Sequence, residues 1–314
     1  MKKRQDSGNA IPVLTTLLVI VLLLTILATY YVFITGKDNE RILLEINEQR
    51  ALSEQIAKYV LSAANGNVDA FAQIASSRER FDRSIASLKS LSPESMRQPV
   101  TAHETLWLEM RGTADKVAAN REQISELTRL INLAIARIPG LQSNIRAITR
   151  QIVSVTAGER PDLRVITQQL QVLERMGRSL DNIFRGGAKS AEAIDTFGRD
   201  TNRFRQVLDG MVTGDPSIGV EQVTDVEARE ELEKLASGYN DFQDIANNIF
   251  GLVPSLLAAL EASDNITDIS TRLNNSSAAL IDRFLVVPGR FSIGALRTGP
   301  CLVYVLGALA VLIA

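Results

Sequence analysis

Apolar residues recur along most of the chain at the three- and four-residue spacings of an amphipathic helix. Two stretches, residues 71–88 and 194–211, place them identically although few letters agree. In the first the apolar positions are Phe71, Ile74, Phe81, Ile85 and Leu88. In the second they are Ile194, Phe197, Phe204, Leu208 and Met211. The spacing is that of heptad a and d positions, so each stretch is predicted to form a helix with one buried seam.

One position of each seam is polar: Arg78 in the first stretch and Thr201 in the second. A polar residue on a seam can fix the register or the oligomeric state of packed helices, at some cost in stability. For Arg78 the alternative is a long side chain lying along the bundle edge with its charge in water.

The match between the two halves extends in both directions. Upstream, residues 53–67 and 174–188 agree in pattern, and each ends in a glycine, Gly66 or Gly186, suited to a left-handed helix cap. Downstream, both halves continue a helical seam and then carry proline and glycine, which are predicted to end or kink the helix, at 138–141 and 251–254.

One narrow apolar stripe cannot fold alone, but four such helices close a bundle. The sequence therefore predicts an all-α protein with two tandem four-helix-bundle sensor units, residues 38–158 and 159–287. The alternative is two unrelated helical hairpins that agree by chance. Nine large apolar residues are expected in the core: Phe71, Ile74, Phe81, Ile85, Leu88, Trp107, Phe197, Phe204 and Leu208. His103 is expected on the surface, near the start of a helix.

Two longer apolar runs lie at the ends of the chain. Residues 11–35 carry no charge and as a helix would reach about 37 Å, enough to cross a bilayer core of roughly 30 Å. We predict a transmembrane helix there rather than a cleaved signal peptide. Lys2, Lys3 and Arg4 would keep residues 1–10 as a cytoplasmic tail. Residues 293–314 are predicted to be a partial second transmembrane helix that is truncated; the alternative is a tail that dips into the membrane.

Composition narrows the possible functions. The net charge of -2 does not favour nucleic acid as a partner. The single cysteine, Cys301, excludes an internal disulfide and a multi-thiol metal site, and the single histidine disfavours zinc sites and Ser-His-Asp triads. We therefore expect no enzyme activity, no catalytic residue, no metal and no cofactor.

Residues 46–88, from INEQRALSEQ to SIASL, and the lone tryptophan in TLWLEMR resemble the N-terminal periplasmic sensor region of methyl-accepting chemotaxis transducers of the PilJ type, which work with type IV pili. The resemblance implies a sensor in a bacterial inner membrane, with residues from about 38 to 290 in the periplasm and a role in twitching motility. We also expect a homodimer, because a single bundle has no partner to move against. The cue would be a small ligand or the pilus itself. A HAMP linker and a cytoplasmic coiled coil, absent from the printed chain, would reach the chemotaxis-type kinase and adaptor.

Related modules occur in nitrate- and nitrite-sensing histidine kinases, where an arginine in the matching helix grips a small anion. Arg50 occupies that place here, and the second half has Leu170 instead. The resemblance thus makes Arg50 a candidate ligand-binding residue, against the alternative of a solvated outer-face arginine. Two other functions stay open: the input region of such a kinase, and a non-signalling helical spacer anchored in the membrane.

Overall fold

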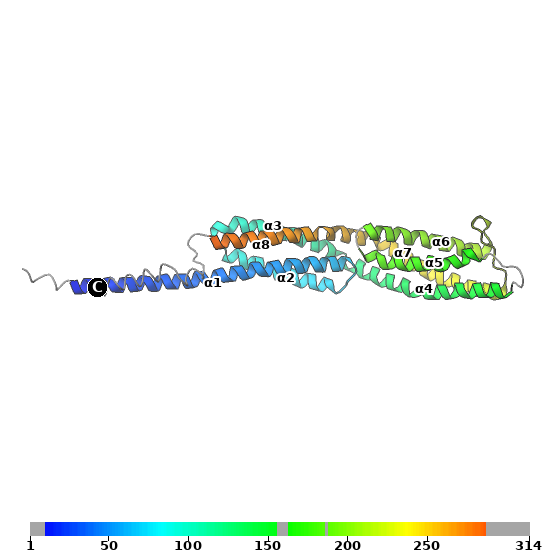
Figure 1. Cartoon of the computed structure of the whole chain (residues 1–314), viewed down its shortest axis with the longest axis horizontal. Helices are drawn as coiled ribbons and strands as arrows, with labels where there is room; N and C mark the ends of the chain where they lie inside the picture. Colours follow the sequence, from blue (N-terminus) through cyan, green and yellow to red (C-terminus); the bar gives the residue numbers. More distant parts are fainter. Residues whose placement is uncertain (1–9, 156–162, 186–187, 287–314) are drawn as a thin grey trace, which may run out of the picture. The chain divides into compact units, whose positions relative to one another are not determined.

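The computed structural model describes residues 10–155, 163–185 and 188–286, which form eight α-helices (Figure 1). Their bounds are α1 Ala10–Ala64, α2 Ala70–Leu91, α3 Arg97–Ala119, α4 Arg121–Val155, α5 Arg164–Asn182, α6 Ala188–Thr213, α7 Val226–Asp264 and α8 Ile266–Val286. Short 3₁₀ helices lie at Glu94–Met96, Ile183–Arg185 and Pro216–Ile218. Within the described ranges no β-strand is present, only an isolated bridge between Asp215 and Val220, so the all-α prediction is confirmed.

The described residues divide into two compact units. Unit 1 contains the described parts of residues 1–53, 79–107 and 271–314, and unit 2 those of residues 54–78 and 108–270. Each unit therefore takes segments from both predicted sensor units. Unit 1 combines parts of α1, α2 and α3 with α8 from the second half, while in unit 2 α4 from the first half packs on α5 and α7 from the second. The predicted limits 38–158 and 159–287 describe a repeat in the sequence and stay a prediction.

The buried positions of the first half of the chain recur in the second half, as the repeat in the sequence predicts. Along α3–α4 and α7–α8 the buried positions recur with a constant difference in residue number of 132, as in Val100/Leu232, Trp107/Tyr239, Met110/Phe242, Val117/Ile249 and Ile148/Leu280. Along α1 and α5 the difference is 120, as in Leu52/Val172, Ile56/Met176 and Val60/Leu180, and along α2 and α6 it is 123, as in Ile74/Phe197, Phe81/Phe204 and Leu88/Met211. Constant differences mean that equivalent helices bury equivalent faces, as a duplicated unit would.

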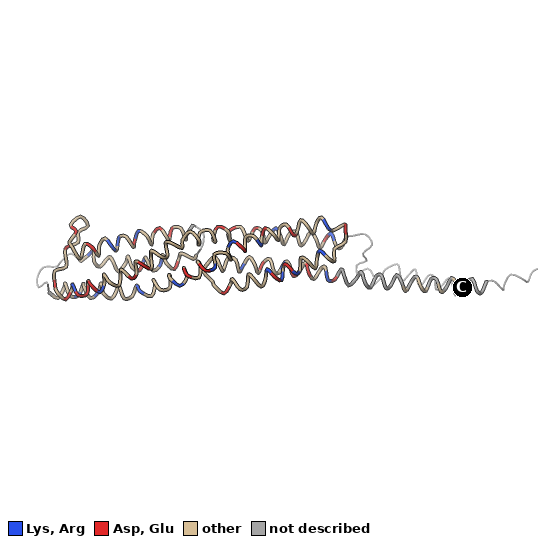
Figure 2. The backbone as a smooth tube through the Cα atoms, turned by 180° about the vertical axis from the view of Figure 1, so that it is seen from behind, with Lys and Arg blue, Asp and Glu red and all other residues tan. Residues whose placement is uncertain are grey.

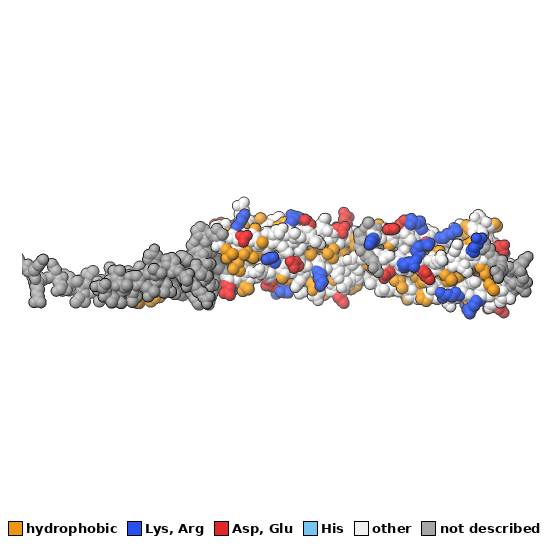
Figure 3. Space-filling model, in the orientation of Figure 1, with side chains coloured by type: hydrophobic (Ala, Val, Ile, Leu, Met, Phe, Trp, Pro, Cys, Tyr) orange, Lys and Arg blue, Asp and Glu red, His pale blue; other side chains and the backbone are white. Residues whose placement is uncertain are grey.

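The nine residues expected in the core are all buried, none with more than 6% of its surface exposed. Acidic and basic residues occur along all the described helices (Figure 2), and apolar side chains form scattered groups on the face drawn in Figure 3. This partition is what heptad-spaced apolar stripes require of helices packed in a bundle.

The helix breaks predicted at 138–141 and 251–254 are wrong. Pro139 lies inside α4 and Pro254 lies inside α7, and both helices continue past them. The turns fall instead at Asn120, between α3 and α4, and at Asn265, between α7 and α8. A proline removes one backbone hydrogen bond from a helix, but packing on both sides can hold the helix together. Ile138 and Leu141, which flank the Pro-Gly pair, are both buried.

Gly66 ends α1 as predicted. Its φ of 86° is left-handed, and its amide donates to the carbonyl of Ala63 at 3.0 Å while the amide of Asn67 donates to that of Ser62 at 3.0 Å. These two bonds satisfy carbonyls that the helix end would otherwise leave open. Gly186, its counterpart, lies outside the described residues.

The predicted span 11–35 lies within α1. Several of its large apolar side chains are more than half exposed: Val19, Leu22, Leu23 and Ile26. Among the described residues, the one helical stretch long and apolar enough to cross a membrane by length and hydropathy is Val226–Leu285, in which 33% of the most apolar window is buried. That stretch is α7 with α8, and it supplies core residues such as Phe242 and Leu256. The predicted tail helix 293–314 and Cys301 lie outside the described residues.

Candidate functional site

The most distinctive feature of unit 1 is a chain of polar side chains buried among its helices. Gln49 of α1 and His103 of α3 are both fully buried, and Ser84 of α2 is 4% exposed. Ser276 of α8 and Glu45 of α1 lie at the two ends and are half-buried. We call these five residues the polar chain.

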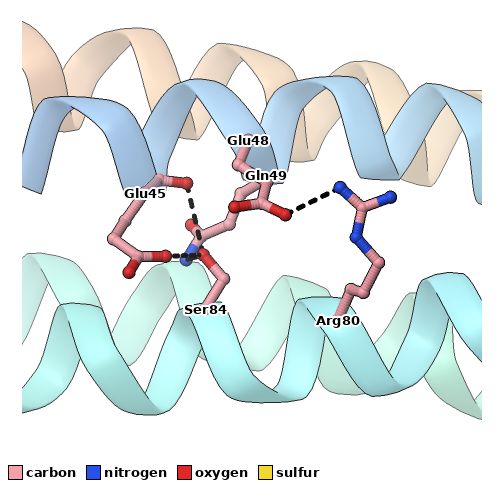
Figure 4. Close-up of polar contacts among 5 residues, drawn as sticks. All are labelled: Glu45, Glu48, Gln49, Arg80 and Ser84. Atoms are coloured by element: carbon pink, nitrogen blue, oxygen red, sulfur yellow. Dashed lines mark hydrogen bonds and ion pairs between the residues drawn. The ribbon is translucent and has the colours of Figure 1, made fainter. Parts of the chain in front are cut away.

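Four hydrogen bonds join the side chains of the polar chain, and the Ser84 hydroxyl also lies 3.3 Å from the backbone carbonyl of Glu45. The His103 ring contacts the hydroxyl of Ser276 through Nδ1 at 3.0 Å and Oε1 of Gln49 through Nε2 at 2.9 Å. The amide nitrogen of Gln49 donates to Ser84 Oγ at 3.1 Å, and this hydroxyl donates to Glu45 Oε2 at 2.6 Å (Figure 4). The polar chain therefore links four helices through the centre of unit 1.

The donors of the polar chain all point the same way. Oε1 of Gln49 can only accept, so His103 donates from Nε2 and its Nδ1 accepts from the hydroxyl of Ser276. Ser84 accepts from the Gln49 amide and passes its own proton towards the Glu45 carboxylate, which can only accept when ionised. The hydrogen-bonding groups thus fix both the tautomer of His103 and the orientation of Gln49.

The surface position predicted for His103 is wrong. The α3 helix begins at Arg97, so His103 lies well inside it, on the buried side with Val100 and Trp107. Burial lowers the pKa of the imidazole from 6.5 to about 4, so His103 is neutral at neutral pH. The spacing of three and four residues from Val100 and Trp107 was the sequence signal that would have placed it correctly.

Aromatic packing borders the polar chain. The Trp107 ring stacks on Phe81 with centroids 4.0 Å apart and an interplanar angle of 13°. Its indole N–H donates to Asp82 Oδ1 at 2.8 Å. The Phe81 ring also lies 6.5 Å from the His103 ring. A large apolar wall on one side of His103 explains why its charged form is disfavoured.

Two further contacts flank the polar chain. The hydroxyl of Ser53 donates to Asn274 Oδ1 at 2.8 Å, which joins α1 directly to α8. On the outer side of α1 and α2, Arg80 donates to Glu48 at 2.9 Å (Figure 4). Both residues of this ion pair are exposed by more than 40%, so we expect it to add little to stability.

The second half of the chain lacks this arrangement. Gln169, the counterpart of Gln49, is also buried, but its Nε2 bonds the carbonyl of Val165 in its own helix and its Oε1 has no partner. The counterparts of Ser84 and His103 are apolar, Val207 and Leu235. The repeat therefore gives two versions of this packing, and in the second version valine and leucine replace the serine and the histidine while the glutamine is kept.

The seam residues singled out from the sequence lie in unit 2. Arg78 is 21% exposed, forms an ion pair with Asp115, and keeps its Nε buried without a partner. Thr201 is buried: its hydroxyl bonds the carbonyl of Phe197, and its own carbonyl accepts the Tyr239 hydroxyl at 2.6 Å. Burial raises the pKa of Tyr239, which therefore stays a neutral donor.

Arg50, the candidate anion ligand, is exposed on α1 and lies outside the polar chain. Its backbone carbonyl accepts from Ser53 at 2.8 Å. The ligand-binding role of its guanidinium stays a prediction. Sequence reasoning missed Gln49, Ser84, Ser276 and Glu45, although Gln49 interrupts the apolar stripe through Ile46 and Ile56.

The polar chain can fix the relative positions of the helices that it joins. Its groups are one neutral imidazole, one amide, two hydroxyls and a carboxylate, and the hydrogen bonds described above join them to one another. Among the described residues there is no group of three histidine, cysteine or carboxylate side chains placed to hold a metal ion.

Comparison with known proteins gives two relatives. The chain is 27% identical over 312 residues to the protein PilJ of Pseudomonas aeruginosa, covering 97% of this chain and 45% of that protein. It is 28% identical over 254 residues to a protein of Alcanivorax borkumensis that is named "putative methyl-accepting chemotaxis AlkN", covering 80% of this chain and 37% of that protein. No family model matches the sequence. The chain spans less than half the length of these curated relatives, and the predicted resemblance is confirmed: the chain is similar to a region of PilJ-like chemotaxis transducers.

Proposed function

We propose that the chain is the periplasmic sensing and transmembrane input region of a methyl-accepting chemotaxis receptor linked to type IV pili and twitching motility. The observation that carries the proposal is the similarity to PilJ over 97% of the chain. In this proposal residues 11–35 anchor the chain in the bacterial inner membrane and residues 38–290 lie in the periplasm.

The helix that contains residues 11–35 supports the anchor. The segment has no charged residue, and Val19, Leu22, Leu23 and Ile26 expose more than half of their surface. Exposed apolar side chains on an uncharged helix of this length are favoured in lipid and disfavoured in water. The three basic residues that precede the segment, Lys2, Lys3 and Arg4, favour a cytoplasmic N-terminus.

The bundle supports a signalling role because it is built of long packed helices. In the receptor, a cue on the outside would shift the packing of these helices by about 1 to 2 Å, and bistable interfaces would pass the shift on. Helices that pass on such a shift need a second copy to move against, so the receptor would act as a homodimer. The kinase and adaptor would be reached through a cytoplasmic region joined to this chain. The cue would be a pilus component or a small ligand, with Arg50 a site for a small anion.

A chimaera tests the proposed function. This chain replaces the matching region of Pseudomonas aeruginosa PilJ in a strain that lacks the native protein, and twitching zones on agar are measured. We expect twitching to return to at least half of the native level. A chimaera with its cytoplasmic part deleted is the control, and it should not twitch. A stably expressed chimaera that gives no more twitching than this control would contradict the proposal.

Topology is tested separately. Alkaline phosphatase fused after Leu285 should be active, and green fluorescent protein fused at the same place should be dark when exported unfolded. The reverse pattern would place the bundle in the cytoplasm and exclude a periplasmic sensor.

A further inference from the structure

The buried polar chain of unit 1 has an internal comparison within the same molecule. Counterparts related by the repeat are Gln49 and Gln169, Ser84 and Val207, and His103 and Leu235. All six side chains are buried, so the two sets occupy the same kind of position in their bundles. The second set shows that this packing does not require a histidine or a serine.

A gain in folding stability is therefore a poor explanation for the polar residues Ser84 and His103 in unit 1. Replacing buried polar groups by apolar ones of similar volume is often neutral or stabilising, because polar groups lose hydration when they are buried. What hydrogen bonds add is direction, since a bond at about 3 Å is lost when its partners move apart, whereas apolar surfaces can slide. A polar residue among apolar seams is the best attested way to fix helix register.

Two hydrogen bonds made by α8 would fix its axial position against α1 and α3. Ser276 is held by Nδ1 of His103 on α3 at 3.0 Å, and Asn274 is held by Ser53 on α1 at 2.8 Å. A slide of α8 by one turn, about 5.4 Å, would bring residues three or four positions away to the level of Ser276. Three of the four residues concerned, Leu273, Ala279 and Leu280, have no side-chain group that can bond an imidazole nitrogen, and the fourth, Arg272, is exposed.

The hydrogen bonds at the Glu45 end of the polar chain determine which nitrogen of His103 accepts a hydrogen bond from α8. Because Glu45 accepts from Ser84, and Ser84 accepts from Gln49, the Gln49 carbonyl is turned towards His103 and fixes its proton on Nε2. Nδ1 is then an acceptor that requires a donor from α8. Among its neighbours in the α8 sequence, Ser276 supplies that donor.

We propose that the chain Glu45–Ser84–Gln49–His103–Ser276 is a register lock, which holds α8 in one axial position against α1, α2 and α3. The apolar counterpart set in unit 2 has no such selectivity. The proposal rests on the proposed function, because the register of α8 matters where this helix passes on a signal. Release of the bond between His103 and Ser276 is then the step that permits α8 to move.

The experiment measures the register directly. Spin labels are placed at Arg83→Cys on α2 and Ala279→Cys on α8, both exposed positions, in the full chain with Cys301→Ser. Pulsed electron paramagnetic resonance then gives the distribution of distances between the labels. In the unaltered polar chain we expect one narrow distribution.

The test variant carries Ser84→Val with His103→Leu, which copies the residues of the second half. We expect its distance distribution to widen at least twofold or to split, with a Tm that falls by no more than about 2 °C. Ser276→Ala should widen the distribution in the same way and serves if the double variant folds poorly. Ser277→Ala is the matched control, because this neighbouring buried hydroxyl bonds only the carbonyl of Leu273 in its own helix, and it should leave the distribution unchanged.

Two results would overturn the register lock. One is a distribution as narrow as the native one in both the double variant and Ser276→Ala. The other is a large loss of Tm in Ser276→Ala but not in Ser277→Ala, which would make the polar chain a plain stabilising element. Since the distances are measured on the purified chain, a failed twitching assay would count against the proposed function and leave this result standing.

Discussion

At the scale of single residues, His103 shows how burial decides chemistry. Its ring is fully buried and bonded on both nitrogens, so its neutral form is matched to its surroundings. Protonation would place a second donor on Nδ1 and a charge beside the Phe81 ring. His103 therefore binds a proton less readily in the folded chain than in the unfolded chain.

Stability should consequently fall with pH in a defined window. The pKa of His103 is about 4 in the folded chain and 6.5 ordinarily, so between these values the unfolded state binds more protons and stability decreases as the pH falls. Between pH 7 and pH 5 we expect a loss of about 2 kcal/mol in the free energy of unfolding from this residue. Urea titrations followed by the fluorescence of Trp107, the one tryptophan, measure it.

His103→Gln is the control for this prediction, because glutamine is polar but does not titrate. His103 is the only histidine, and the carboxylates titrate in both proteins, so the difference between native and variant isolates it. If both proteins lost the same free energy between pH 7 and pH 5, the lowered pKa of His103 would be refuted.

Residue by residue, the sequence predicted apolar burial well and polar burial poorly. Phe81, Trp107 and Phe204 lie on regular seams, and burial of an apolar side chain is the default outcome there. His103 and Gln49 lie on the same seams, but a polar residue in such a place can be bonded inside or turned to water. Which of these occurs depends on partners from other helices, Ser84 and Ser276, that one helix pattern does not contain.

At the scale of elements, the sequence predicted helices reliably and their ends less so. Gly66 was correctly identified as a helix end because a left-handed residue is a local property. Pro139 was misread because its effect depends on the packing of its neighbours, Ile138 and Leu141. The turn at Asn120, in contrast, carries no proline or glycine at all. Helix ends that are set by tertiary packing are hard to predict from local composition.

Glycines inside these helices give a test of the packing. A Cβ added at Gly140 in α4 would meet nothing within 4 Å, while one at Gly177 in α5 would lie 3.2 Å from Ile138 Cδ1. Glycine in a helix interior costs roughly 0.5–1 kcal/mol relative to alanine. We therefore expect Gly140→Ala to stabilise the chain by about that amount, seen as a higher Tm in circular dichroism.

Gly177→Ala is the paired control for this prediction. It gains the same backbone term but must displace Ile138, so its Tm should rise less or fall. A larger gain for Gly177→Ala than for Gly140→Ala would show that the packing of α5 against Ile138 is looser than the structure has it.

At the scale of the whole molecule, the two compact units explain why sequence order misleads. A repeat in sequence suggests two independent bundles, one after the other. Yet the run of α3 with α4 and the run of α7 with α8 each contribute to both units, because the boundaries between the units fall at residues 107/108 in α3 and 270/271 in α8. Most of α8, from the second half of the sequence, lies in unit 1, and α4, from the first half, lies in unit 2. The order of the helices along the sequence does not indicate this exchange.

The exposed side of α1 carries the remaining heptad pattern. Leu44, Asn47, Ala51, Glu54 and Lys58 are exposed at alternating spacings of three and four, and the same phase runs back to Val19, Leu23 and Ile26. Leu44, Ala51, Val19, Leu23 and Ile26 are the apolar members of this stripe, and apolar residues repeated every seven positions favour packing along a partner helix in a left-handed supercoil. Within one chain these positions are uncovered, so the occupant we expect is α1 of a second copy.

Disulfide cross-linking tests this dimer in membranes. In the Cys301→Ser background, Ala51→Cys lies on the exposed stripe, while Arg41→Cys is equally exposed but lies about a quarter turn away from it at 100° per residue. If α1 pairs with α1, the thiols at position 51 approach each other across the symmetry axis, and oxidation should cross-link Ala51→Cys several-fold faster than Arg41→Cys on non-reducing gels. Equal rates would mean random collision in the membrane, and a faster reaction at position 41 would require the chains to meet on another face of α1. Either result would contradict a dimer in which the two copies pair through this exposed stripe of α1.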